Sequence, residues 1–122
     1  MGRRFAFLGL AALAVAAPAS AKMSVGTFVT KASALRANPL TALASPDFAL
    51  LRTEAQTAAA QLKADRDARK AAGKPPIACP PQGQSIGIME MIDGLSALPA
   101  ADQRLSLKDG YAKVIAKRFP CG

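Results

Sequence analysis

Two cysteines, Cys79 and Cys121, constrain the fold of this chain more than any other feature of its sequence. They are its only thiols, and the chain begins with a segment typical of export to a compartment where disulfides form. The simplest interpretation is one structural disulfide that closes the last third of the chain into a loop. A redox-active pair is less favoured, because the two thiols lack the close Cys-x-x-Cys arrangement.

The first 21 residues have the three parts of a secretory signal peptide. Arg3 and Arg4 give a positive start, residues 5–17 carry no charge, and residues 19–21 read Ala-Ser-Ala, a small-x-small cleavage site. The apolar run is shorter than the roughly 20 residues that a membrane-spanning helix needs. We therefore expect cleavage after Ala21, a periplasmic mature protein and no stable membrane insertion.

The mature chain, residues 22–122, has a length that suits one small domain. Loss of the two leader arginines lowers the formal net charge from +8 by two units, so the mature chain stays basic. A basic surface suits nucleic acid, anionic lipid or an acidic protein, but solubility is the simpler interpretation. We expect no nucleic acid partner outside the cytoplasm, because no aromatic side chain is interleaved with the basic cluster for base stacking.

The chain contains no histidine, and this excludes several classes of enzyme. Ser-His and Cys-His nucleophile pairs are excluded, together with the commonest metal sites. Glu90 and Asp93 are three residues apart and would share a helix face, which a glycosidase or a metal site could use. Two carboxylates alone make a poor metal site, and a solvated face explains them as well. We expect no enzymatic activity, no cofactor and no metal.

The hydrophobic pattern predicts an all-α domain of about four helices. Ser24 caps the first helix, which ends at Asn38-Pro39, and a short helical turn over residues 40–44 follows. The longest helix spans residues 46–72, with Ser45 as its cap and Gly73 as its stop. Its predicted buried stripe consists of Phe48, Leu51, Ala55, Ala58, Ala59 and Leu62.

The second half of the long helix has little to bury. Residues 63–74 alternate in charge, with alanine as the only apolar filler, and this pattern predicts a solvated helical arm. The functional alternative is a partner-binding surface formed by Arg66, Arg69 and Lys70.

The last third of the chain predicts two more helices. Ser85 caps the first, which Pro99 ends, and Ser106 with Asp109 forms a capping-box-like start for the second. Pro120 stops that helix one residue before Cys121. The predicted buried faces are Ile88, Met91, Ile92 and Leu95 in the first helix, and Leu107, Tyr111, Val114, Ile115 and Phe119 in the second.

Both ends of this segment carry a family resemblance. It opens with Cys79-x-Pro81-x-Gly83-x-Ser85 and closes with Phe119-Pro120-Cys121. Residues 79–121 thereby resemble the C-terminal half of the Rap/Tai immunity proteins, small periplasmic helical proteins that neutralise peptidoglycan amidases delivered by type VI secretion. Ser85 stands where the family has threonine. Residues 22–78 differ, since they lack the further cysteines and the Gly-Tyr-containing helix of many members.

The resemblance implies one domain, with divergent helices over residues 22–78 and a disulfide-closed helical hairpin over residues 79–122. It also implies a non-enzymatic immunity protein whose protein partner is a cell-wall amidase toxin, and it suggests a homodimer. The alternative is an envelope structural or stress-response protein with a chaperone-like role, which the long alanine-rich helix and the basic surface motivate.

Overall fold

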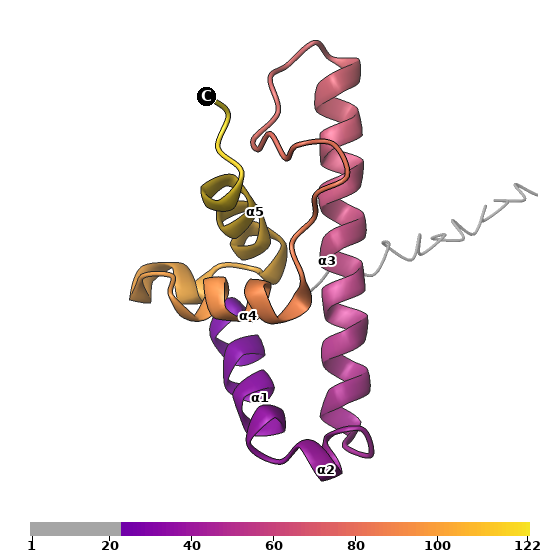
Figure 1. The fold of residues 1–122 in the computed structure, drawn as a ribbon, viewed down its shortest axis with the longest axis vertical. Helices are drawn as coiled ribbons and strands as arrows, with labels where there is room; N and C mark the ends of the chain where they lie inside the picture. The colour runs from indigo at the N-terminus through magenta and orange to yellow at the C-terminus, as the bar shows by residue number, and fades with distance from the viewer. Residues whose placement is uncertain (1–22) are drawn as a thin grey trace, which may run out of the picture.

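The computed structural model describes residues 23–122, and the predicted signal peptide over residues 1–21 lies outside the described residues. Helices are joined by turns and extended segments throughout this part of the chain, and it contains no strand (Figure 1). The predicted all-α class is confirmed. The elements are α1 (Val25–Ala37), α2 (Pro39–Ala42), α3 (Pro46–Ala71), α4 (Ile88–Ser96), a 3-10 helix η1 (Ala100–Arg104) and α5 (Leu107–Arg118).

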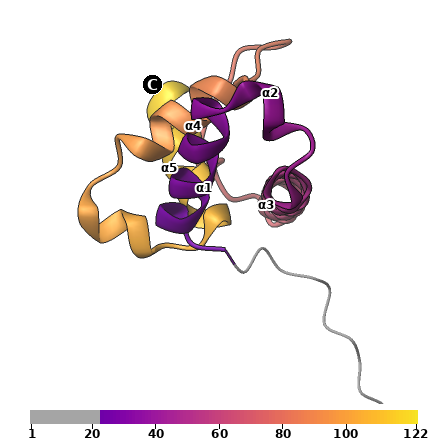
Figure 2. The same ribbon diagram turned by 90° about the horizontal axis from the view of Figure 1, so that it is seen from below.

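The long helix α3 forms one side of the molecule. Viewed end-on in Figure 2, it has α1, α4 and α5 on one side only. These helices share one core, and burial of each large apolar side chain contributes about 1.5–3 kcal/mol. The buried core side chains are Val25, Phe28, Ala32, Leu51, Ala58, Met91, Ile92, Leu95, Leu107, Tyr111 and Val114.

Three predicted helix caps are confirmed by hydrogen bonds. The hydroxyl oxygen of Ser24 accepts from the backbone N–H of Thr27, 3.2 Å away. Ser45 accepts from the N–H of Asp47 at 3.2 Å, and Ser106 accepts from the N–H three residues further on, also at 3.2 Å. Each bond satisfies a donor that the first turn of a helix leaves unpaired.

The starts of α1 and α5 are tied together by their backbones. The N–H of Val25 donates to the carbonyl of Leu105 (2.9 Å), and the N–H of Leu107 donates to the carbonyl of Met23 (3.0 Å). Gly110 permits this close approach of the two helices. A Cβ atom at this position would lie 2.3 Å from Val25 Cγ2, closer than any normal contact.

Gly110→Ala is therefore expected to destabilise the protein, although alanine favours a helix interior by about 1 kcal/mol over glycine. The clash with the side chain of Val25 forces repacking that costs about 1–3 kcal/mol. Thermal unfolding followed by circular dichroism measures the effect. Gly122→Ala is the control, since a Cβ there meets nothing within 4 Å and the residue lies outside every helix of the described chain. An equal melting temperature for Gly110→Ala and the wild type would contradict this packing.

The start of α4 and the connection after it differ from the prediction. The helix begins at Ile88, and its N-cap is Gly87 in an extended conformation, not Ser85. The 3-10 helix η1 was not predicted. It brings the side chain of Gln103 to α4, where its Nε2 donates to the carbonyls of Leu95 (2.9 Å) and Leu98 (3.0 Å).

The buried stripes were predicted too wide at three positions. Phe48 is 37% exposed. Ala59 is also exposed, and Ile88 keeps about half of its surface in contact with solvent. Periodicity finds the apolar face of a helix, but the position of the neighbouring helices decides how much of that face is covered.

Candidate functional site

The C-terminal end of α3 reverses the chain through a glycine turn. Gly73 has a φ of 69°, and its N–H donates to the carbonyl of Lys70 at 3.1 Å. The N–H of Lys74 donates to the carbonyl of Arg69 at 2.9 Å. This pair of bonds defines a Schellman motif, which needs a left-handed residue that glycine supplies without strain. Residues 74–87, called the linker below, then run back along α3 (Figure 1).

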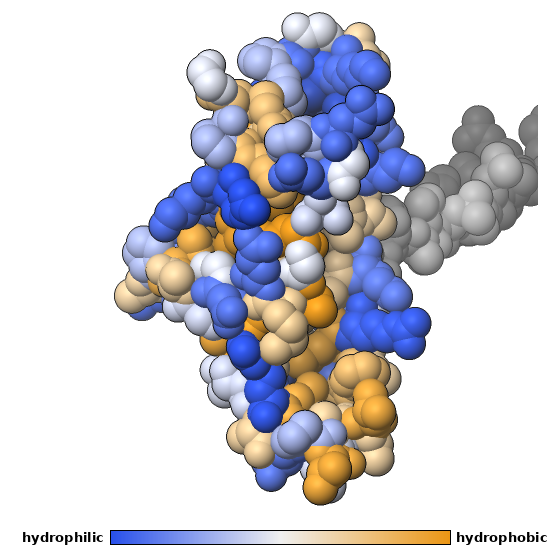
Figure 3. All heavy atoms as spheres, viewed as in Figure 1, coloured by the Kyte–Doolittle hydropathy of each residue, from blue (hydrophilic) through white to orange (hydrophobic). Residues whose placement is uncertain are grey.

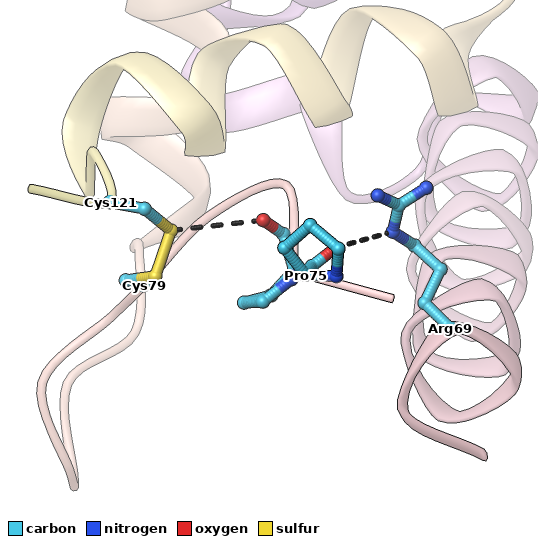
Figure 4. Close-up of a disulfide and its surroundings, with 5 residues drawn as sticks. Arg69, Pro75, Cys79 and Cys121 are labelled. Atoms are coloured by element: carbon cyan, nitrogen blue, oxygen red, sulfur yellow. Dashed lines mark hydrogen bonds between the residues drawn. A yellow bond between two sulfur atoms is a disulfide. The ribbon is translucent and has the colours of Figure 1, made fainter. Parts of the chain in front are cut away.

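The predicted disulfide fixes the linker to the end of α5 (Figure 4). Cys79 and Cys121 are bonded, with their Cα atoms 4.9 Å apart, and the N–H of Cys79 donates to the carbonyl of Phe119 at 2.8 Å. Cys121 Sγ also lies 3.8 Å from the carbonyl oxygen of Pro76. This is a contact and not a hydrogen bond, because a disulfide sulfur carries no proton to donate. The linker is thus held against α5.

Arg69 holds the beginning of the linker from the other side. Its Nε donates to the carbonyl of Pro75 at 2.9 Å, and its side chain is half-buried (Figure 4). The linker is therefore fixed to both α3 and α5.

A groove with a volume of about 800 Å³ lies between the second half of α3, the linker and the helices α4 and α5. Its lining is mostly apolar. The apolar side chains that line it are Ala55, Ala59, Leu62 and Ala68 from α3; Pro76, Ile77, Ala78, Pro80 and Ile86 from the linker; and Ile88, Met91, Tyr111, Ala112 and Ile115 from α4 and α5. These residues define the groove.

Charged side chains at the groove leave an excess of positive charge. Lys63, Arg66, Arg69 and Lys108 line it, against Asp65 and Asp109. Lys108 Nζ lies 2.5 Å from the Asp65 carboxylate and so links α5 to α3. Because this pair is partly exposed, solvent and salt weaken it. Figure 3 shows the hydrophilic C-terminal half of α3 beside apolar surface.

Tyr111 contributes a buried hydroxyl to the floor of the groove. The residue is 5% exposed, and its Oη has no hydrogen-bond partner within residues 23–122. Burial raises the pKa of Tyr111 to about 12, because the anion would lose its hydration. The hydroxyl therefore stays protonated at neutral pH. Its ring packs edge-to-face on Phe28, with ring centroids 6.4 Å apart.

Two of the three residues predicted as a partner surface lie at the groove. Arg66 and Arg69 line the groove, whereas Lys70 is exposed and lies outside it. Between residues 63 and 74 every side chain except Arg69 is exposed, as a solvated face predicts. The path of the linker beside the second half of α3 was not predicted. Because the linker lies there, one face of the predicted arm lines the groove.

The two carboxylates of the enzymatic alternative take part in contacts between helices. Glu90 accepts from Arg118 Nε of α5 at 2.7 Å, and Asp93 accepts from Arg36 Nη1 of α1 at 2.9 Å. Neither lines the groove. Within the described part of the chain, no three His, Cys, Asp or Glu side chains gather as a metal site would require.

Among the described helices, none combines the length and the apolar character that crossing a membrane requires. Comparison of the chain with protein-family models, with curated proteins and with solved structures found no match.

Proposed function

We propose that this chain is a periplasmic, non-enzymatic binding protein of the immunity type, and that it neutralises a peptidoglycan amidase by binding to it through the groove. The observation that carries the proposal is the groove itself, a concave apolar surface with a positive excess at its edge. Apolar concave surfaces with a few placed polar groups are typical of binding sites.

Two of the residues that carry the family resemblance hold one wall of the groove in place. Cys79 and Cys121 fix the linker to α5, and the apolar wall formed by Ile77 and Ile86 lies on either side of Cys79 in the sequence. A wall that is fixed before binding loses less conformational entropy when a partner docks. The disulfide therefore supports a preformed binding surface as well as the fold.

The experiment that tests the proposal is capture from the native periplasm. The full chain, exported with its own leader and purified with its disulfide intact, is used as bait, and the captured proteins are identified by mass spectrometry. We expect one folded partner at a fixed stoichiometry whose peptidoglycan hydrolysis stops when the bait saturates it. Capture of many unfolded clients would instead support the chaperone-like alternative, and capture of no protein would contradict the proposal.

Reversal of one charge at the groove is expected to weaken binding to that partner. Arg66→Glu removes a positive charge from the edge and adds a negative one, and we expect an affinity loss of about ten-fold, mostly through slower association at low salt. Surface plasmon resonance at two salt concentrations measures both the affinity and the association rate.

The matched control for this prediction is Arg52→Glu, which makes the same change at an exposed position of α3 outside the groove. Lys70→Glu should resemble the control, because Lys70 also lies outside the groove. Equal affinities for Arg66→Glu, Arg52→Glu and the wild type would show that the groove edge takes no part in binding.

A further inference from the structure

One face of α3 presents a helix-packing stripe to the groove. Ala55, Ala59, Leu62, Arg66 and Arg69 line it at alternating spacings of four and three residues. This is the spacing at which one helix receives the side chains of a second helix. The stripe is about 21 Å long at the usual rise per residue, which matches about four turns of a partner helix. Ala59 and Arg66 are exposed in this stripe, whereas Ala55 and Leu62 also pack partly against the core.

The opposite side of the groove offers large apolar side chains that the described residues leave uncovered. Ile77 of the linker is 49% exposed and Ile88 of α4 is 54% exposed. Both line the groove across from the α3 stripe. A partner with an apolar stripe of its own would bury these side chains and the alanines of α3 together.

The positive charge at the edge of the groove favours a partner with negatively charged side chains. Lys63 and Arg66 are exposed, and the positive charges at the groove outnumber the negative ones by two. Glutamates or aspartates beside the apolar stripe of a partner helix would complement them, whereas lysines would be repelled.

From the stripe, the uncovered isoleucines and the charge, we infer that the groove binds an amphipathic α-helix of the protein partner, with one apolar face and acidic flanks. The inference rests on the proposed function in taking the groove as the binding surface. A helix of about four turns matches the length of the α3 stripe, and its acidic flanks would complement the positive edge of the groove.

The inference is tested without the native partner, by titrating a fluorescent model peptide of about five turns. The probe carries leucine at the stripe positions and glutamate beside them. A second peptide has the same composition in scrambled order, and a third has lysine in place of glutamate. Fluorescence anisotropy reports binding to the oxidised full chain. We expect the scrambled and the lysine peptides to bind at least about ten-fold more weakly than the acidic helix.

Ala59→Arg supplies the matching change in the protein, because it places a long charged side chain in the middle of the stripe. Ala59 is exposed, so the variant should fold, and its circular dichroism melt checks this. Ala60→Arg is the control at the next position, which is exposed and outside the groove. We expect Ala59→Arg to weaken binding of the acidic peptide about ten-fold and Ala60→Arg to leave it unchanged.

Three results would overturn the inference: equal binding of the acidic and scrambled peptides, no effect of Ala59→Arg, or binding to phosphatidylglycerol vesicles with no binding of the acidic peptide. The last would assign the groove to anionic lipid. If the native partner is captured equally by Ala59→Arg and wild type, the inference fails while the proposed function stands. If the peptide binds as expected but no hydrolase is captured, the proposed function fails instead.

Discussion

Reduction of the disulfide between Cys79 and Cys121 is expected to lower the melting temperature by about 15–30 °C. The bond closes a loop with a sequence separation of 42, and chain-entropy estimates put the contribution of such a loop at about 4 kcal/mol. A domain of this size has a total stability of about 5–15 kcal/mol, so the loss is a large share of the total. Circular dichroism melts with and without a phosphine reductant measure it.

The control for this prediction is the double variant Cys79→Ser/Cys121→Ser, whose melt should be low in both conditions and should not respond to the reductant. A thiol assay confirms that reduction is complete. An unchanged melting temperature after complete reduction of the wild type would show that the linker and the end of α5 are held by other contacts. Reduction should also weaken binding of the acidic peptide, because the linker forms one wall of the groove.

Leu95→Ala is expected to cost about 2–5 kcal/mol of unfolding free energy. Leu95 is 0% exposed on α4 and packs where α5 approaches at Gly110, so its loss leaves a cavity between helices. Urea unfolding measures the effect as a lower midpoint at an unchanged slope.

Leu40→Ala makes the same change at a position that is 99% exposed on α2, and it is expected to shift stability by at most about 0.5 kcal/mol. Comparison of the two variants therefore separates the effect of burial from the effect of the leucine-to-alanine change itself. Equal losses of unfolding free energy in the two variants, or a loss in neither, would contradict a core shared by α1, α3, α4 and α5.

The sequence allowed the helix caps and stops to be predicted because they depend on local hydrogen bonds. Ser24, Ser45 and Ser106 accept from nearby N–H groups as predicted, and Gly73 ends α3 in a left-handed turn. The pairing of Cys79 with Cys121 was predictable because the chain has no other thiol.

The groove was not predictable, because it depends on contacts between residues far apart in the sequence. The four-and-three spacing of the predicted buried stripe continues beyond Leu62 to Arg66 and Arg69, and it indicated that the predicted solvated arm keeps one face in line with that stripe. Whether that face of α3 is exposed to solvent or lines a groove depends on the path of the linker. The disulfide and the bond from Arg69 to Pro75 decide this, and neither is visible in periodicity. For the same reason the exposure of Phe48 and Ile88 was missed.

The most direct test of the groove as the binding surface is hydrogen–deuterium exchange of the oxidised full chain, alone and saturated with the protein captured from the periplasm. We predict slower exchange over the second half of α3 and over the linker, residues 74–87, with little change over α2, which lies far from the groove (Figure 1). Protection confined to α2 and the first turns of α3, where Leu40, Leu43 and Phe48 are exposed, would contradict the account and place the partner at the opposite end of the molecule.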